Sequence, residues 1–222
     1  MLSKKTLLRR CVNVFVFAVF FSAIANISGA AQDSIELSEP DLSGGKLLMQ
    51  ALKERKSVRN FNRKELPIKV LSNLLWAADG INRQESGKRT SPSARNWQEI
   101  DIYAAMKSGL YLYNAQENRL DPIMTRDIRE FTGVQDFTQI APVNLIYVSD
   151  HSKITGGSDL KAKEFYSAAD TGFISQNVYL FCASEGLVTV VLGWVDKPAL
   201  KKVMKLRDDQ HITLTQPVGY PK

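Results

Sequence analysis

The sequence predicts an α+β fold, because helical and strand patterns are mixed along the chain without strict alternation. Apolar residues at helical spacing mark the helices, and the longest of these runs covers residues 161–184. Short apolar runs rich in β-branched residues mark the strands, most clearly over residues 143–148. The 222 residues are 44% hydrophobic, which is ordinary for a single globular domain with a buried core.

The first thirty residues have the layout of a secretory signal peptide. An apolar run from Val12 to Ala25 precedes the small residues Ser28-Gly29-Ala30, and a basic head comes first, formed by Lys4, Lys5, Arg9 and Arg10. The alternative is an uncleaved membrane anchor, but the run is shorter than the roughly 18 residues of a spanning helix. We therefore expect cleavage after residue 30, a flexible polar leader over 31–45 and a folded domain over 46–222.

This interpretation changes what the charge means. The formal net charge of +6 includes the four basic residues of the signal, and the remaining chain has 25 basic and 23 acidic residues. We expect no nucleic-acid partner, because no strongly basic face is left to displace counterions. We also expect export to the bacterial periplasm, with no stable membrane anchor after cleavage. Cys182, the one cysteine outside the signal, falls in an apolar helical run and is interpreted as a core thiol.

Two helices are predicted early in the domain. Leucines recur at helical spacing over 47–52 and are followed by a basic run. A second helix is predicted to begin at Pro67 and to end before Gly80, since proline suits the first turn and glycine the position after the last. The polar residues 82–98 are expected to form a loop.

The rest of the chain is predicted to supply most of the sheet. A short helix is expected over 125–131, a long one over 161–184 that Gly186 closes, and a last one beginning at Asp196. Apolar or alternating patterns predict strands over 100–106, 110–113, 119–123, 143–148, 187–192 and 212–218.

No familiar catalytic arrangement is visible in the sequence. His151 and His211 are far apart in the sequence and lack neighbours with metal-ligand spacing, so we expect no metal site. The sequence also lacks a nucleophile elbow, a glycine-rich phosphate loop and a dinucleotide fingerprint. No catalytic residue is named from these patterns.

A first candidate segment follows the first predicted helix. Within five residues it carries three cations and a hydroxyl, at Arg55, Lys56, Ser57 and Arg59. Arginine forks bind phosphate oxygens in pairs, and serine adds a neutral donor. The alternative is a solvated basic helix end, where cations favour the helix dipole.

A second candidate segment runs from Ser91 to Gln98. Amide and hydroxyl side chains gather there, and amides offer donor and acceptor together, which suits the edge of a planar heterocycle. The alternative is an ordinary loop rich in proline and serine.

Together the two segments resemble those of the nitroreductase-like FMN-dependent oxidoreductases. Arg-x-Ser-x-Arg-x-Phe begins at Arg55, and Pro-Ser-Ala-x-Asn-x-Gln begins at Pro92. Later stretches resemble the family's central helix, its strand-to-loop element and its last strand, over 169–177, 185–187, 190–193 and 217–221. The resemblance covers nearly the whole chain from Lys46 to Tyr220.

The resemblance implies a role for each matching residue. The FMN phosphate and ribityl chain would be held by Arg55, Lys56, Ser57 and Arg59. The isoalloxazine would be contacted from the other subunit by Pro92, Ser93, Ala94 and Asn96, in a loop that Gln98 supports. Backbone N–H groups near flavin N5 would come from Leu192 and Gly193. The fold implied is a central, mostly antiparallel sheet flanked by helices, in an intertwined homodimer.

The activity implied is ping-pong hydride transfer through flavin N5, from NAD(P)H to a nitroaromatic, a quinone or a similar small acceptor. An exported protein would meet little nicotinamide, so the electron donor stays open. Three alternatives also remain: a dehydrogenase acting on peptide azolines in the same superfamily, a non-catalytic flavin-binding redox carrier, and a module that no longer holds FMN.

Overall fold

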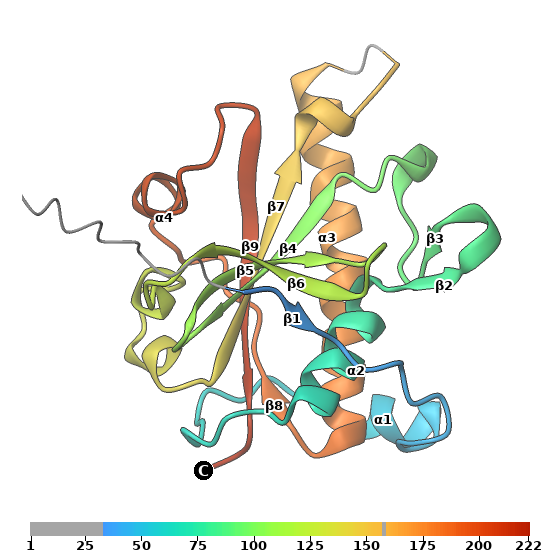
Figure 1. The fold of residues 1–222 in the computed structure, drawn as a ribbon, viewed down its shortest axis with the longest axis vertical. Coiled ribbons are helices and arrows are strands. Elements are labelled where there is room, and N and C mark those ends of the chain that lie inside the picture. The colour runs from blue at the N-terminus through green and yellow to red at the C-terminus, as the bar shows by residue number, and fades with distance from the viewer. Residues whose placement is uncertain (1–32, 157–158) are drawn as a thin grey trace, which may run out of the picture. The chain divides into compact units, whose positions relative to one another are not determined.

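The computed structural model describes residues 33–156 and 159–222. The predicted signal peptide lies outside these residues. Within them the fold is α+β, as predicted, and a seven-stranded antiparallel sheet has the order β1-β6-β5-β4-β7-β9-β8 (Figure 1). None of the helices in this part of the chain combines the length and apolar character needed to cross a bilayer.

The helices lie close to their predicted positions. They are α1 (Leu48–Glu54), α2 (Ile68–Asp79), α3 (Leu160–Glu185) and α4 (Lys197–Met204). The strands of the main sheet are β1 (Ile35–Glu36), β4 (Ile100–Met106), β5 (Gly109–Asn114), β6 (Arg119–Met124), β7 (Val143–Asp150), β8 (Val188–Thr189) and β9 (Gln210–Gly219). A separate small hairpin joins β2 (Ile81–Arg83) to β3 (Lys88–Arg89).

Both faces of the central strands are buried. In β7, Leu145 and Tyr147 belong to the core shared with α2 and α3, whereas Ile146 and Val148 belong to the core shared with α4. Figure 1 shows α3 and α4 on opposite sides of the sheet. Because side chains alternate along a strand, a strand covered on both faces is apolar throughout, which is the pattern seen in the sequence.

The ends of α3 follow their expected local chemistry. The Asp159 carboxylate accepts a hydrogen bond from the Ala162 N–H (2.8 Å) and caps the first turn. Gly186 ends the helix with a φ of 69°, a left-handed conformation that glycine adopts without steric cost. The predicted closure at Gly186 is therefore confirmed.

The described part of the expected flexible leader, residues 33–45, is anchored instead. Ile35 pairs with Leu120 as β1 adds to the edge of β6, and Leu37 is buried against the core. The Ser38 N–H donates to the Ser72 hydroxyl (2.9 Å). The composition suggested a free segment, but an edge strand with unpaired backbone groups binds even a short extended stretch.

Three other predicted elements also differ. The expected loop at 82–98 contains the hairpin β2–β3, and the expected helix at 125–131 is reduced to a 3₁₀ turn at Arg129–Phe131. The expected strand at 187–192 is regular only over β8, followed by a single bridge between Leu192 and Thr215. In each case tertiary contacts override a short local pattern.

Candidate functional site

The segment after α1 lies against the C-terminal part of α3. The Arg55 guanidinium is 5.1 Å from the centre of the Tyr179 ring, and the Ser57 hydroxyl is 2.8 Å from the Tyr179 hydroxyl. The Val58 N–H donates to the Thr189 carbonyl (3.0 Å), which ties the segment to β8. A cavity of about 440 Å³ beside it is lined by residues of α1, α3 and β8. The segment is therefore fixed by Arg55, Ser57 and Val58.

Its cations have no acidic partners. Lys56 and Arg59 are exposed and Arg55 is half-buried, and across the residues that the structure describes none of the three has a carboxylate within 4 Å. The neighbouring Glu54 carboxylate already binds the Lys46 ammonium (2.5 Å). Three unpaired cations beside a hydroxyl form a site suited to a phosphate-like anion.

Tyr179 joins this segment to the stretch after β8. Its hydroxyl accepts a hydrogen bond from the Val191 N–H (2.9 Å) while it contacts Ser57. Sequence reasoning missed Tyr179, because an aromatic residue in an apolar helix is ordinarily a core residue. The structure thus connects the segment Arg55–Arg59, through Tyr179, to Val191, the residue before Leu192 and Gly193.

The predicted role of Leu192 needs correction. Its N–H donates to the Thr215 carbonyl (2.8 Å), and its carbonyl accepts from the Thr215 N–H (3.1 Å). The Leu192 backbone is thus already paired, and its side chain is buried. Gly193 is exposed and its N–H has no acceptor among the described residues, so of the two only Gly193 has a backbone donor free for a ligand. The adjacent Trp194 has 72% of its surface exposed.

The second segment has an unusual backbone. Three of its residues lie in the left-handed region, with φ of 51° at Arg95, 57° at Asn96 and 49° at Gln98. This conformation costs roughly 1–2 kcal/mol for most residues other than glycine, and less for asparagine. Such a loop persists only when its surroundings hold it, and strain of this kind gathers at functional sites.

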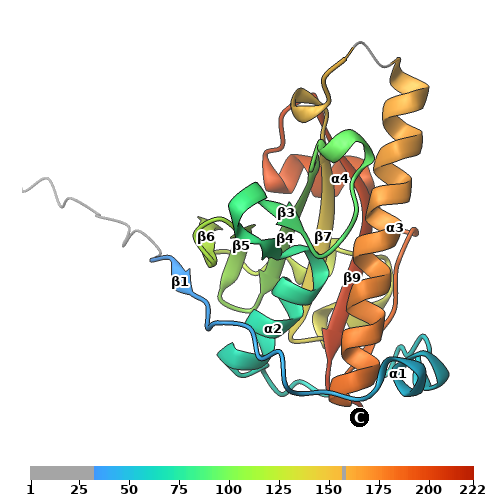
Figure 2. The ribbon, with the colours of Figure 1, turned by 90° about the vertical axis from the view of Figure 1, so that its right-hand side faces the viewer.

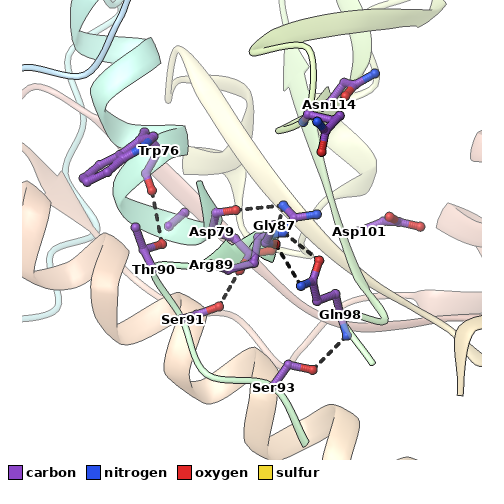
Figure 3. Close-up of polar contacts among 12 residues, drawn as sticks. Trp76, Asp79, Gly87, Arg89, Thr90, Ser91, Ser93, Gln98, Asp101 and Asn114 are labelled. Carbon is purple, nitrogen blue, oxygen red and sulfur yellow. Dashed lines mark hydrogen bonds and ion pairs between the residues drawn. The ribbon is translucent and has the colours of Figure 1, made fainter. Parts of the chain in front are cut away.

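Gln98 supplies part of that support, as Figure 3 shows. Its side-chain oxygen accepts from Arg89 Nε (3.0 Å), and its amide nitrogen donates to the Gly87 carbonyl (3.1 Å). Its backbone N–H donates to the Ser93 hydroxyl (2.8 Å). The bond to Ser93 joins the two ends of the loop, and the bonds to Arg89 and Gly87 attach the loop to the β2–β3 hairpin.

Arg89 extends the support to α2 (Figure 3). It donates to the Asp79 carbonyl (2.9 Å) and forms an ion pair with the Asp79 carboxylate (3.5 Å), which also accepts from the Ser91 hydroxyl. Burial raises the pKa of Asp79 to about 6, although Arg89 and Ser91 act in the opposite direction. The sequence does not show that Asp79 and Arg89 are in contact, because they come together only when the β2–β3 hairpin packs against the end of α2.

The loop is also bound to α3. The Ala94 N–H donates to the Asp170 carboxylate (2.8 Å), and Trp97 packs edge-on against Tyr166 with ring centres 5.7 Å apart. Pro92 and Asn96 stay exposed, and Ser93 and Ala94 are half-buried. A cavity of about 560 Å³ is lined by Pro92, Ser93, Asn96 and Gln98 together with residues of the hairpin.

The structure does not bring the two segments together in one chain. Their contacts on α3, Asp170 and Tyr179, are nine residues apart, which is about 14 Å along a helix and about half a turn around it. Figure 2 accordingly shows α1 and the strand β3 on opposite sides of α3.

Comparison with known proteins identifies the family. A model of the nitroreductase family matches residues 52–220. Two relatives bear the name "putative nitroreductase". One, from Methanocaldococcus jannaschii, is 28% identical over 84% of this chain and 97% of its own. The other is a crystal structure from Ralstonia eutropha JMP134, 41% identical over 87% of this chain and 92% of its own, with a TM-score of 0.82.

A more distant structure shares the fold. It is an NADPH:FMN oxidoreductase from Vibrio harveyi, 18% identical over 79% of this chain and 69% of its own, with a TM-score of 0.60. The family model covers well over half of the chain, and its matched range contains both candidate segments. The chain therefore belongs to the nitroreductase family of flavin oxidoreductases.

Proposed function

We propose that the protein binds FMN and passes electrons by a ping-pong mechanism to a nitroaromatic, a quinone or a similar small acceptor. One observation carries the proposal: a cluster of unpaired cations is joined through the Tyr179 hydroxyl to the backbone around Gly193. Tyr179 contacts Ser57 among the cations and Val191 two residues before Gly193, so an anion site and a free backbone donor lie in neighbouring parts of the same chain. This arrangement matches a ligand with a phosphate at one end and a polar ring at the other.

The donor set fits the phosphate end of FMN. Arg55 and Arg59 would bind phosphate oxygens through their guanidinium forks, with Lys56 as a further charge. Ser57 would add a neutral donor, held in place by the Tyr179 hydroxyl (2.8 Å). Because no carboxylate neutralises these cations within the described ranges, the phosphate displaces only water on binding.

The isoalloxazine ring of FMN would be bound by backbone groups. Bound FMN supplies the hydride chemistry at N5, so the protein needs no nucleophile of its own. Gly193 would direct its N–H toward the ring, and the paired backbone of Leu192 would hold that N–H in place. The exposed Trp194 indole next to it offers a flat apolar surface for an aromatic acceptor.

The site is proposed to form between two copies of the chain. Within one chain the loop at Pro92–Gln98 lies on the opposite face of α3 from the cations, so the second wall of the flavin site would come from the partner. The exposed apolar side chains support a homodimer, because large unpartnered apolar surfaces mark interaction sites. Those on α1 and α3 include Leu48, Met49, Phe165 and Phe173.

We further propose that NAD(P)H is the donor to test first and that residues 1–30 direct export to the periplasm. The fold shared with an NADPH:FMN oxidoreductase supports the choice of donor. The basic head, apolar run and small residues of the first thirty positions support export. Cell fractionation with N-terminal sequencing of the mature protein tests the second proposal.

Purification tests the flavin directly. The proposal expects a yellow protein that releases FMN on denaturation and bleaches anaerobically with NADH or NADPH. A colourless protein that takes up no added FMN would refute the flavin site. A yellow protein that neither nicotinamide reduces would favour a redox carrier or another donor.

A further inference from the structure

Two buried carboxyl groups meet beneath the loop that carries the proposed flavin contacts. Glu99, just before β4, is 0% exposed, and Asp170 on α3 is 3% exposed. The Asp170 carboxylate accepts from the Ala94 N–H (2.8 Å), and Glu99 Oε2 accepts a longer bond from the Ser93 hydroxyl (3.4 Å). The pair therefore connects the sheet, the long helix and the first residues of the strained loop.

No cation balances this pair. In the described part of the chain neither carboxylate has a Lys, Arg or His nitrogen within 4 Å. The charged groups on the adjoining strands are already paired, because Asp101 binds Lys153 (2.6 Å) and Asp150 binds Arg207 (2.7 Å). Two ionised carboxylates in contact at a buried site repel each other strongly, so one of them retains a proton.

The hydrogen bonds indicate where that proton lies. Glu99 Oε1 is buried and has no hydrogen-bond donor among the described residues, whereas Asp170 is within hydrogen-bonding reach of Glu99. Burial raises the pKa of Glu99, and the charge of Asp170 raises it further. Burial also raises the pKa of Asp170, although the Ala94 N–H and the Ser93 hydroxyl act in the opposite direction. A proton on Glu99 that is donated to Asp170 satisfies both groups.

We infer that Glu99 is a positioning residue: it donates a shared proton to Asp170 and so holds Asp170 as the acceptor for the Ala94 N–H. The effect on flavin binding rests on the proposed function, whereas the support of the loop does not. Three left-handed residues follow Ala94, so the loop depends on this external bond. When the pair loses its proton, repulsion between two carboxylates separates Asp170 from Glu99 and weakens the hold on Ala94.

Three variants test the inference. Glu99→Gln keeps a donor toward Asp170 but cannot ionise, and Glu99→Leu removes the donor. Asp101→Asn is the matched control, because Asp101 lies two residues after Glu99, on β4, and its carboxyl has its own cation partner. The FMN dissociation constant is measured from about pH 5 to about pH 9. Hydrogen exchange of residues 90–98 is measured in the flavin-free protein over the same range and corrected for intrinsic rates.

The expected result is a loop that loosens as the pH rises. In the wild type and in Asp101→Asn, FMN affinity should fall about tenfold across the range while exchange at residues 90–98 rises. Glu99→Gln should keep only the smaller change that ionisation of Asp79 causes near about pH 6, and Glu99→Leu should be as loose as the alkaline wild type even at about pH 5. Infrared spectra of the wild type should contain a protonated carboxyl band that is absent from Glu99→Gln.

Equal pH dependence in the wild type and Glu99→Gln would overturn the inference. So would the absence of a protonated carboxyl band that depends on Glu99. If no variant and no wild-type sample binds FMN, the proposed function fails, but hydrogen exchange and the infrared band still decide the role of Glu99. If Glu99→Leu does not fold, the comparison of Glu99→Gln with the wild type is sufficient.

Discussion

The two segments proposed to contact the flavin are held in opposite ways. The loop Ser91–Gln98 is fixed by buried polar groups, with Gln98, Arg89 and Asp79 on one side and Asp170 on the other. The segment Arg55–Arg59 is held by Ser57, by Val58 and by the contact of Arg55 with the Tyr179 ring, and among the described residues none of its cations has a carboxylate partner. The loop is held by contacts within the protein, whereas the cation segment leaves its charges open to an anion. Substitutions in the two segments should therefore affect different properties.

The largest effect is expected from Arg59→Glu. Replacing an exposed cation by an anion at the phosphate site should weaken FMN binding by about 100-fold, since charge-assisted bonds contribute roughly 1.5–3 kcal/mol each. The free energy of unfolding should stay within about 0.5 kcal/mol of the wild type, because the Arg59 side chain has no hydrogen-bond or ion-pair partner among the described residues. Flavin titration and urea denaturation measure the two quantities.

Lys202→Glu is the matched control for this charge reversal. Lys202 is exposed on α4, away from the cation segment, so the variant should keep the wild-type FMN affinity. An Arg59→Glu protein with normal flavin content would contradict the assignment of Arg59 to the phosphate site.

Substitutions at Asp79 should mainly change the free energy of unfolding, in contrast to Arg59→Glu, which should mainly change FMN affinity. Asp79→Leu leaves the partly buried Arg89 unpaired and should lower the free energy of unfolding by about 3 kcal/mol. Asp79→Asn keeps an acceptor for Arg89 and Ser91 and should stay within about 1 kcal/mol of the wild type at neutral pH. Urea denaturation of both variants measures this difference. If Asp79→Leu is as stable as Asp79→Asn, Arg89 does not depend on Asp79.

Asp79 also gives the loop region a specific pH dependence. Because its pKa is raised from 3.8 to about 6 in the folded state, the folded protein binds this proton more tightly than the unfolded chain. Its contribution to stability is therefore complete below about pH 4 and is lost as the pH rises through about 6. The wild type should lose about 3 kcal/mol relative to Asp79→Asn over this range. Parallel stability curves for the two proteins would contradict the raised pKa.

The smallest effect is expected from Tyr179→Phe. Loss of the hydroxyl removes the contact with Ser57 and leaves the Val191 N–H without its acceptor. We expect the free energy of unfolding to fall by about 1 kcal/mol and FMN binding to weaken about tenfold, since Tyr179 contacts both the cation segment and the stretch after β8. Calorimetry and flavin titration check the pair of values. A loss of stability with unchanged affinity would restrict Tyr179 to a structural role.

The sequence predicted the elements with long patterns and missed contacts between distant residues. The apolar length of α3 and the glycine after it marked both ends of that helix, because local capping chemistry sets them. Asp79, Arg89 and Glu99 gave no signal, since a charged residue next to a helix or strand usually lies on the surface. Their importance depends on burial, which only the packed chain reveals. The paired Leu192 N–H was missed for the same reason, because a single bridge to Thr215 leaves no pattern in the sequence.

The central claim is that each flavin site combines the cation segment of one chain with the loop of its partner. A mixed dimer tests it most directly, with Arg59→Glu in one chain and Pro92→Trp in the other, purified through two different tags. Each homodimer should lack FMN, since both of its sites carry the change. The mixed dimer has one intact site and should bind about one FMN, because a two-fold dimer has two equivalent sites. A mixed dimer as free of flavin as its two parents would contradict the shared site.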